Sequence, residues 1–596
     1  MKNHIYTLKC LLIATFMLGG CNDQFLERFP LDQVSNDTFW NTANDLATYN
    51  NFYYHLLQDD VNFPIMLGHH GGFDSQIASY LHLDGFADNL APNHERHRPF
   101  QQVRAGRQII PTSSSGIANQ WYGFRGWNLV RAINIGLENY PKAAIPEDIR
   151  NRYAGEARMF RGWFYHHIVK MFGDAPWVER ELNIDSEELF TARMPREQVM
   201  DKVLADLNFA TSHLPNDWGD GNEPGRFNRW AALLVKSRVC LFEGTWRKYH
   251  GGSNPEMWLK EAADAAKDLI DNGPYALYST GNPTMDYNAY HRALDVSGNP
   301  EVMVWRRYLL GIRTNHVQDY YSYSGGATRN FVEDYLCSDG LPISLSNLYQ
   351  GDDSIEDVFV NRDPRMRQTI LHPEDAGFYM YHNADGRTYP RIQGQPGGRT
   401  SSTGYQVIKH YNANDMIGKA FDTGEFPAII LRFAEALLNY AEAKAELGEI
   451  TQGDLDVSIN LLRDRVGMPH LGINPPMDPR YANDGISPLL VEIRRERRIE
   501  LFGEGFRYDD LRRWKQGKKL EKPDMGIQWN AAAETRFAGA IIHTSVDPEN
   551  GKTYIDVYKN SDWANPVFDE NKDYLWPIPL NDLAQNPNLG QNPGWD

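Results

Sequence analysis

Apolar side chains recur every three or four residues through much of the first half of the chain. Within residues 151–172, the apolar positions at this spacing are Ala154, Ala157, Phe160, Phe164, Ile168 and Phe172. That spacing is typical of a helix that buries one side. The same pattern predicts helices over residues 120–140, 197–214, 229–243 and 257–272.

Short turns separate these predicted helices, so consecutive helices can pack against each other. A later pair is predicted over residues 432–448 and 454–466, where several alanines would let two helices approach closely. Stacked helix–turn–helix units are typical of tetratricopeptide-like repeats. The predicted fold is therefore mainly α, with a tetratricopeptide-like helical repeat scaffold, long loop-rich insertions and a few short strands.

Several aromatic residues fall on the helical pattern and are expected in the core. They are Trp121, Trp127, Trp163, Trp230, Trp258, His166 and His167. The helical spacing of apolar residues is absent over residues 68–115 and 274–425. Short strands are expected within residues 274–425. Long stretches without their own periodicity often carry function, so we expect functional residues there.

The first residues have the layout of a secretory signal. Lys2 and Lys9 precede a short apolar run over residues 11–18, which is followed by Gly19-Gly20-Cys21. The run is far shorter than the roughly 20 residues that span a bilayer. We predict a lipoprotein signal over residues 1–20, cleaved before Cys21, so that Cys21 carries the lipid and tethers the chain.

The chain is acidic, and this limits its partners. It has 60 Lys and Arg against 78 Asp and Glu, which gives a net charge of −18. Nucleic acid is not expected as a partner, because its phosphates require basic surfaces. Attraction to anionic lipid is excluded as well, because it also requires a basic surface. The tether must therefore depend on acyl chains.

Cysteine is scarce, and no spacing of Cys or His resembles a metal site. Cys10 and Cys21 belong to the signal and its cleavage site, which leaves Cys240 and Cys337. Two buried thiols are favoured for that pair, and a disulfide between them is the alternative. No cofactor is expected, and a structural calcium ion is left open.

The segment 493–501 alternates arginine with glutamate at helical spacing, and Asp509 and Asp510 follow it. Such residues can pair along one helix. We interpret the segment as an ion network that braces the last helices, with the two aspartates capping a helix over residues 511–515. An arginine cluster for an anionic ligand is the less favoured alternative, because acids are already interleaved.

Five groups of residues resemble the RagB/SusD family. The segment 494–514 reads RRERRIELFGEGFRYDDLRRW and is similar to the family's C-terminal signature. Earlier matches are AGEAR at 154–158 with FGDAP at 172–176, RDPR at 362–365, and LRFAE at 431–435 with YAEA at 440–443. The ending resembles the family too, with WPIP at 576–579 and QNPGW at 591–595.

The resemblance implies a fold and a function. Family members are largely helical lipoproteins on the outer face of the outer membrane. They pair with a TonB-dependent transporter and capture oligosaccharides or polysaccharides, or in some branches peptides, without catalysis. The resemblance also suggests a division into two regions. Residues 21–280 would form an N-terminal helical repeat region, and residues 281–596 a C-terminal region with the loop-rich, ligand-binding insertion.

Aromatic residues outside the helical pattern are the first candidates for ligand contact. They are dense between residues 300 and 335, where arginines are interleaved with them. The candidates are Trp305, Arg306, Tyr308, Tyr320, Tyr321 and Tyr323. An aromatic ring can cover the C–H face of a sugar while polar side chains bind its hydroxyls. Ordinary packing of a strand pair is the alternative.

A second group of candidates lies in the histidine-rich stretch near residue 70. Its members are His69, His70, Phe73 and Tyr80, which we expect at the rim of a glycan site. Metal binding is not expected, because the spacing matches no known ligand set.

Two other functions stay open at this point. A surface glycoside hydrolase needs two carboxylates facing a cleft, and the sequence has many acids but no motif that places such a pair. An adaptor that captures peptides or proteins through a helical groove would not need the long aromatic loops. We therefore favour glycan capture over both.

Overall fold

The computed structural model describes most of the chain after the predicted signal and spacer. The described residues are 39–57, 67–69, 80–93, 98–113, 123–219, 225–315, 317, 325–375, 390–395, 400–412 and 423–595. Cys21, His70, Phe73, Trp121 and the tyrosines at 320, 321 and 323 lie outside them.

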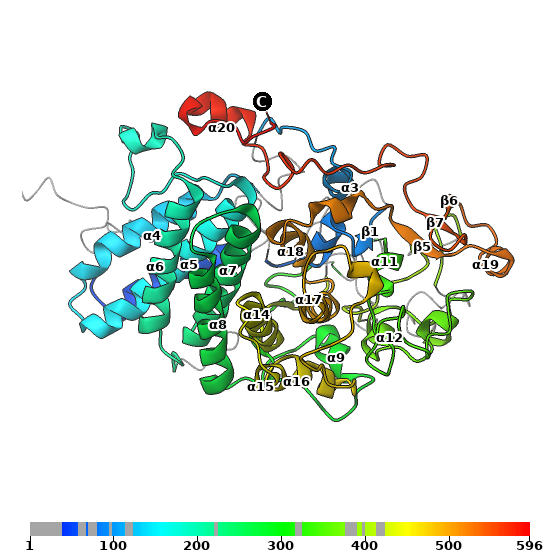
Figure 1. Cartoon of the computed structure of the whole chain (residues 1–596). Coiled ribbons are helices and arrows are strands. Elements are labelled where there is room, and N and C mark those ends of the chain that lie inside the picture. Colours follow the sequence, from blue (N-terminus) through cyan, green and yellow to red (C-terminus); the bar gives the residue numbers. More distant parts are fainter. Residues whose placement is uncertain are drawn as a thin grey trace, which may run out of the picture.

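The first half of the fold is a row of long helices that lie side by side (Figure 1). After the short α2 (Ala43–Asn50), the row consists of α4 (Trp127–Asn139), α5 (Glu147–Phe172), α6 (Arg196–His213), α7 (Arg229–His250) and α8 (Pro255–Asn272). These bounds confirm the predicted helices in this half. Three ends differ from the prediction by more than two residues: α4 begins only after Gly126 at φ 88°, α5 begins already at Glu147, and α7 continues to His250.

Glycines at two helix crossings explain how closely these helices pack. A Cβ atom on Gly162 of α5 would lie 3.2 Å from Leu207 of α6. A Cβ atom on Gly244 of α7 would lie 2.9 Å from Leu259 of α8, which is too close for any other residue. Small residues at a crossing therefore bring the two backbones together, as expected for stacked helical repeats.

A second group of helices packs beside α8, with α14 (Phe433–Glu446) in contact with it. The others are α15 (Gln452–Asp456), α16 (Ile459–Arg465), α17 (Pro488–Glu500) and α18 (Arg507–Arg513). The single helix predicted over 454–466 is wrong. Ser458 has a non-helical backbone (φ −139°, ψ −93°), which divides the segment into α15 and α16.

The strands are short and belong to three small antiparallel sheets. In the first two sheets, β1 (Leu90–Ala91) pairs with β3 (Gly326–Ala327), and β2 (Val302–Arg306) pairs with β4 (Ala428–Arg432). The third has the order β5-β7-β6, from β5 (Met525–Gln528), β6 (Thr544–Val546) and β7 (Thr553–Asp556). The mainly helical prediction with few short strands is confirmed.

Short helices connect these parts. They are α3 (Arg98–Arg104), α9 (Asp286–Ala289), α11 (Arg329–Val332), α12 (Arg365–Thr369), α19 (Ala531–Arg536) and α20 (Leu580–Gln585). Among the described helices, none is long and apolar enough to cross a membrane.

One large hydrophobic core runs through both halves of the fold. It extends in sequence from Trp40 to Leu589, so the division near residue 280 is not a core boundary and stays a prediction. Trp163, Trp230 and Trp258 are buried in this core as predicted, while Trp127 is only partly buried. His166 and His167 are buried as well. Cys240 and Cys337 are buried free thiols.

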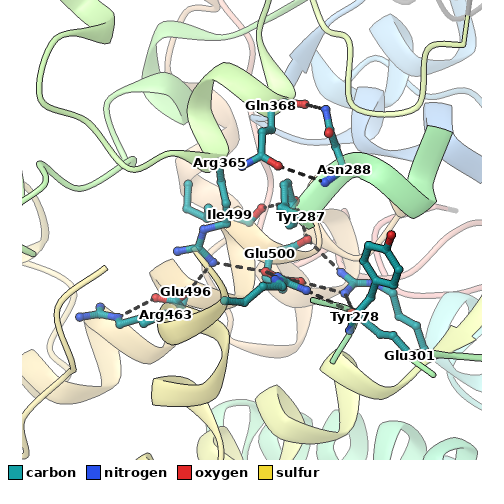
Figure 2. A network of polar contacts seen from close by, with 12 residues as sticks. Tyr278, Tyr287, Asn288, Glu301, Arg365, Gln368, Arg463, Glu496, Ile499 and Glu500 are labelled. Carbon is teal, nitrogen blue, oxygen red and sulfur yellow. Dashed lines mark hydrogen bonds and ion pairs between the residues drawn. The ribbon is translucent and has the colours of Figure 1, made fainter. Parts of the chain in front are cut away.

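The arginine-rich helix α17 lies at the centre of a buried ion network, as predicted. The Glu500 carboxylate is completely buried and accepts hydrogen bonds from Arg432 at 2.8 Å and from Arg465 at 2.7 Å. Arg365 lies between Glu496, at 2.5 Å, and Glu500, at 3.3 Å (Figure 2). Arg365 belongs to the RDPR turn and Arg432 to the LRFAE motif, so three of the sequence motifs meet in this network.

Most of the partners of α17 come from other elements rather than from the helix itself. The closest partners of its arginines are Glu446 for Arg494, Asp478 for Arg495, Asp510 for Arg497 and Asp334 for Arg498. The predicted capping by Asp509 and Asp510 is wrong, because α18 begins at Arg507 and Asp510 binds Arg497 instead. The arginines are therefore neutralised by protein carboxylates, which leaves no reason to assign them an anionic ligand.

Candidate functional site

The β2–β4 pair places three of the predicted ligand residues. Trp305 lies opposite Ile429, Arg306 lies opposite Ala428, and Tyr308 follows two residues after the end of β2. Successive side chains of a strand point to opposite faces. Trp305 accordingly packs in a small separate cluster that includes Tyr290 and Ile429, whereas Tyr308 belongs to the main core.

His69 joins Tyr308 and two other rings in a stack that sequence spacing could not predict. The His69 ring lies 5.6 Å from Tyr80, 5.5 Å from Tyr308 and 5.6 Å from Phe426, measured between ring centres. All three pairs are stacked. We call His69, Tyr80, Tyr308 and Phe426 the aromatic stack. It brings together three distant regions of the sequence, since His69 and Tyr80 are close in sequence while Tyr308 and Phe426 each lie more than 100 residues further on.

Hydrogen bonds fix the aromatic stack to the backbone. The Tyr308 hydroxyl accepts from the His69 N–H at 2.6 Å and donates to the His69 carbonyl at 3.0 Å. The Tyr80 hydroxyl donates to the Ile429 carbonyl at 2.7 Å. Burial raises the pKa of Tyr80 and of Tyr308, so both hydroxyls stay protonated at neutral pH.

The four described aromatic candidates are buried. His69, Tyr80, Trp305 and Tyr308 are each less than a tenth exposed, and their rings pack against protein. In this structure the four side chains support the surrounding segments, and none of the four rings offers a free face to a ligand. This agrees with the alternative of ordinary packing. Their contact with a ligand stays a prediction, as does that of His70, Phe73, Tyr320, Tyr321 and Tyr323, which lie outside the described residues.

Accessible groups lie beside the aromatic stack, at the end of β2, on the turn that follows it and just before β4. The Arg306 guanidinium lies 5.0 Å from the Tyr308 ring centre and remains partly accessible. Leu310 and Ile312 are 67% and 83% exposed, and the Leu310 N–H donates to Glu425 at 3.0 Å. This region therefore combines the charged groups of Arg306 and Glu425 with the exposed apolar edge of the turn, a mixture suited to a polyhydroxylated ligand.

Sequence reasoning missed this apolar edge because it searched for aromatic residues. Leu310-Gly311-Ile312 is a short aliphatic group around a glycine with φ 86°. A glycine between two apolar residues in a stretch without periodicity was the available signal for an exposed turn.

The described residues contain no cluster of typical metal-binding side chains. No group of three or more His, Cys, Asp or Glu side chains among them could hold an ion. The question of a structural calcium ion stays open, because backbone and amide oxygens also bind calcium.

Two family models match the chain. The model of the SusD family matches residues 289–595. A second model, described as starch-binding associating with outer membrane, matches residues 76–241.

Relatives of similar length exist in Formosa agariphila. The SusD-like protein P2 is 23% identical over 601 aligned residues, which cover 100% of both chains. The SusD-like protein P38 is also 23% identical and covers 87% of this chain and 92% of its own.

Solved structures share the fold over almost the whole chain. A SusD-like carbohydrate binding protein from Bacteroides fragilis has a TM-score of 0.71 and 22% identity, covering 93% of this chain and all of that one. A laminarin binding SusD-like protein has a TM-score of 0.56 and 18% identity, covering 93% of this chain and 99% of its own. At these identities, the likeness establishes a common helical scaffold.

Proposed function

The chain belongs to the SusD family, and from that premise we propose that it captures oligosaccharides or polysaccharides at the cell surface without cleaving them. The observation that carries the proposal is the pair of family matches, one of them described as starch-binding, which together include most of the described residues. The laminarin binding neighbour supports a glycan ligand and suggests a β-glucan as one probe.

The accessible turn beside the aromatic stack supplies suitable chemistry for the proposed contact. Guanidinium and carboxylate groups such as Arg306 and Glu425 bind sugar hydroxyls, and aliphatic or aromatic surfaces cover the C–H face. The stack itself holds the segments on which these groups lie. A preformed support lowers the entropy that binding would otherwise lose.

We also propose that Cys21 carries the lipid anchor and that the partner is a TonB-dependent transporter of the outer membrane. The signal pattern at residues 1–21 supports the anchor, and the description of the second family model supports association with the outer membrane. A tether near the transporter raises the effective ligand concentration there, so the capture site does not need high affinity.

The proposed function is tested with the chain from residue 22 onward, which contains every residue that the structure describes. Affinity electrophoresis against laminarin, starch, xylan and mannan measures retardation, and a reducing-sugar assay measures cleavage. We expect retardation by at least one glycan and no release of sugar. Sugar release would support a hydrolase, and the absence of retardation by every glycan would support a peptide-capturing or adaptor role.

Replacing Tyr320, Tyr321 or Tyr323 with alanine is expected to weaken glycan binding about tenfold or more. Stacking of an aromatic ring on a sugar depends on the full ring face, and one lost anchor commonly costs a factor of this size. Calorimetry measures the affinity, and thermal melting checks that the fold is unchanged. The matched control is Tyr153→Ala on α5, a partly buried tyrosine outside both stretches. Unchanged affinity in all three variants would remove these residues from the site.

A further inference from the structure

A second concave site lies far from the aromatic stack in sequence, at the C-terminal side of α3. It is a pocket of about 400 Å³ between the end of α3, the β5-β7-β6 sheet and the loop after β7. Pockets for small ligands range from about 300 to 1,000 Å³. This pocket is therefore large enough for a single sugar unit.

The loop that closes the pocket is held in place by hydrogen bonds to the α3 region. The Tyr558 hydroxyl donates to the Pro92 carbonyl at 2.5 Å. Arg107 donates to the Ala564 carbonyl at 2.9 Å, and the Val567 N–H donates to the Ala105 carbonyl at 3.3 Å. Because both ends of the loop are fixed, the pocket exists before any ligand arrives.

Arg104, at the wall of the pocket, has unused hydrogen-bonding capacity. Its side chain is 4% exposed and one terminal nitrogen donates to Asp524 at 2.9 Å and to the Lys522 carbonyl at 2.8 Å. Its Nε and its other terminal nitrogen have no hydrogen-bond partner among the described residues. A buried donor without an acceptor is costly, so this guanidinium favours an oxygen-bearing occupant in the pocket.

Two carboxyl groups supply the acceptors. Asp524 and Asp556 line the pocket together with Ser545, whose hydroxyl donates to Asp556 at 2.7 Å. Burial raises the pKa of Asp524 to about 6, although the neighbouring Arg104 opposes this shift. The pocket thus offers both donors and acceptors, as the hydroxyl groups of a sugar require.

Trp563 adds an aromatic surface to this polar pocket. Its ring is partly buried and lines the pocket, and the Arg98 guanidinium lies 5.7 Å from the ring centre. An indole is the largest flat apolar surface that a side chain provides. A flat ring beside hydroxyl-binding groups is the combination that binds a pyranose ring.

We propose that this pocket is a second glycan-binding site, which holds one neutral sugar unit between Trp563 and the polar groups of Arg104, Ser545 and Asp556. The inference rests on the proposed function and deepens it, because a second contact on the same protein strengthens the binding of a long chain. The sugar is neutral because the lining has no net charge: the carboxylates of Asp524 and Asp556 are balanced by Arg104 and Lys559.

The test observes Trp563 directly. The chain from residue 22 onward is labelled with 5-fluorotryptophan, and the Trp563→Phe variant identifies the Trp563 signal in the ¹⁹F spectrum. Titration with laminarihexaose and with maltohexaose then follows that signal. We expect a saturable shift with at least one of the two sugars.

Two conservative variants show which groups cause the shift. Asp556→Asn is expected to lower the sugar affinity measured from the Trp563 signal about tenfold, because it converts a carboxylate that lines the pocket into an amide. The matched control is Asp562→Asn, which makes the same chemical change at an exposed neighbour outside the pocket and is expected to leave the titration unchanged.

A Trp563 signal that does not move with either sugar would overturn the inference. Calorimetry on the same samples separates the two proposals. Heat of binding without a Trp563 shift would reject the second site while the proposed function stands. The absence of both heat and shift would contradict the two together for these sugars. Equal weakening by Asp556→Asn and Asp562→Asn would also reject the site.

Discussion

Replacing Glu500 with glutamine is expected to lower the free energy of unfolding by about 3–5 kcal/mol, the usual cost of breaking a buried ion pair. Glu500 is completely buried and accepts hydrogen bonds from Arg432, Arg465 and Arg365. The amide removes the negative charge but keeps the shape of the side chain. Three buried guanidinium groups would then lack their shared counter-charge. Guanidinium chloride unfolding, followed by tryptophan fluorescence, measures the change.

The matched control for this prediction is Asp264→Asn on α8. Asp264 pairs with Lys260 at 2.9 Å, and both side chains are more than half exposed. Water and salt screen such a pair, so the midpoint of the unfolding curve is expected to be unchanged. If Glu500→Gln shifted the curve no more than Asp264→Asn, the ion network would not be a main source of stability.

Acidification is expected to unfold the protein near pH 3–4 without added denaturant. Buried carboxyl groups beside arginines have lowered pKa values in the fold. Nearby guanidinium groups lower the pKa of Asp88, Asp334, Glu500 and Glu504, and that of Glu442 to about 2. Desolvation by burial raises these pKa values, but the arginines outweigh it.

The sign of the effect follows from the direction of these shifts. A carboxyl group whose pKa is lowered in the fold stabilises it above the unfolded pKa, about 4, and this contribution is lost as the pH falls toward the folded pKa. Below about pH 4 the unfolded chain binds more protons at these groups than the folded chain does, so the free energy of unfolding falls as the pH falls. The raised pKa of Asp524 acts in the opposite direction between pH 4 and 6.

Fluorescence and circular dichroism across pH 7 to 2 measure this acid transition. We expect a cooperative loss of tertiary structure, with its midpoint moving to lower pH when salt or osmolyte stabilises the fold. A protein that kept its native spectra at pH 2 would show that the buried carboxylates contribute little.

Local periodicity explains why so much of the fold could be predicted. Residues 151–172 carry a helical apolar pattern throughout, and α5 covers this whole range. The ion network was predictable for a similar reason, because arginine and glutamate alternate within one short segment. In contrast, the partners of Arg498 and Arg365 come from distant elements, and no local pattern identifies Asp334 or Glu496 as those partners.

The candidate sites depend even more on contacts between distant segments. Aromatic density identified Tyr308, but the stack also requires His69 and Phe426, which lie more than 100 residues away on either side. The burial of these rings could not be read from the sequence, because a half-buried strand and an open binding loop have the same composition. No pattern in the sequence indicated the pocket at Arg104, because its walls come from segments about 400 residues apart.

Glycan capture without cleavage is tested most directly by calorimetric titration of the chain from residue 22 onward with soluble glycans, including laminarin. We expect a saturable heat of binding for at least one glycan, with the glycan recovered at its original length. A flat titration for every glycan, or recovery of shortened chains, would show that the protein does not capture glycans in this way.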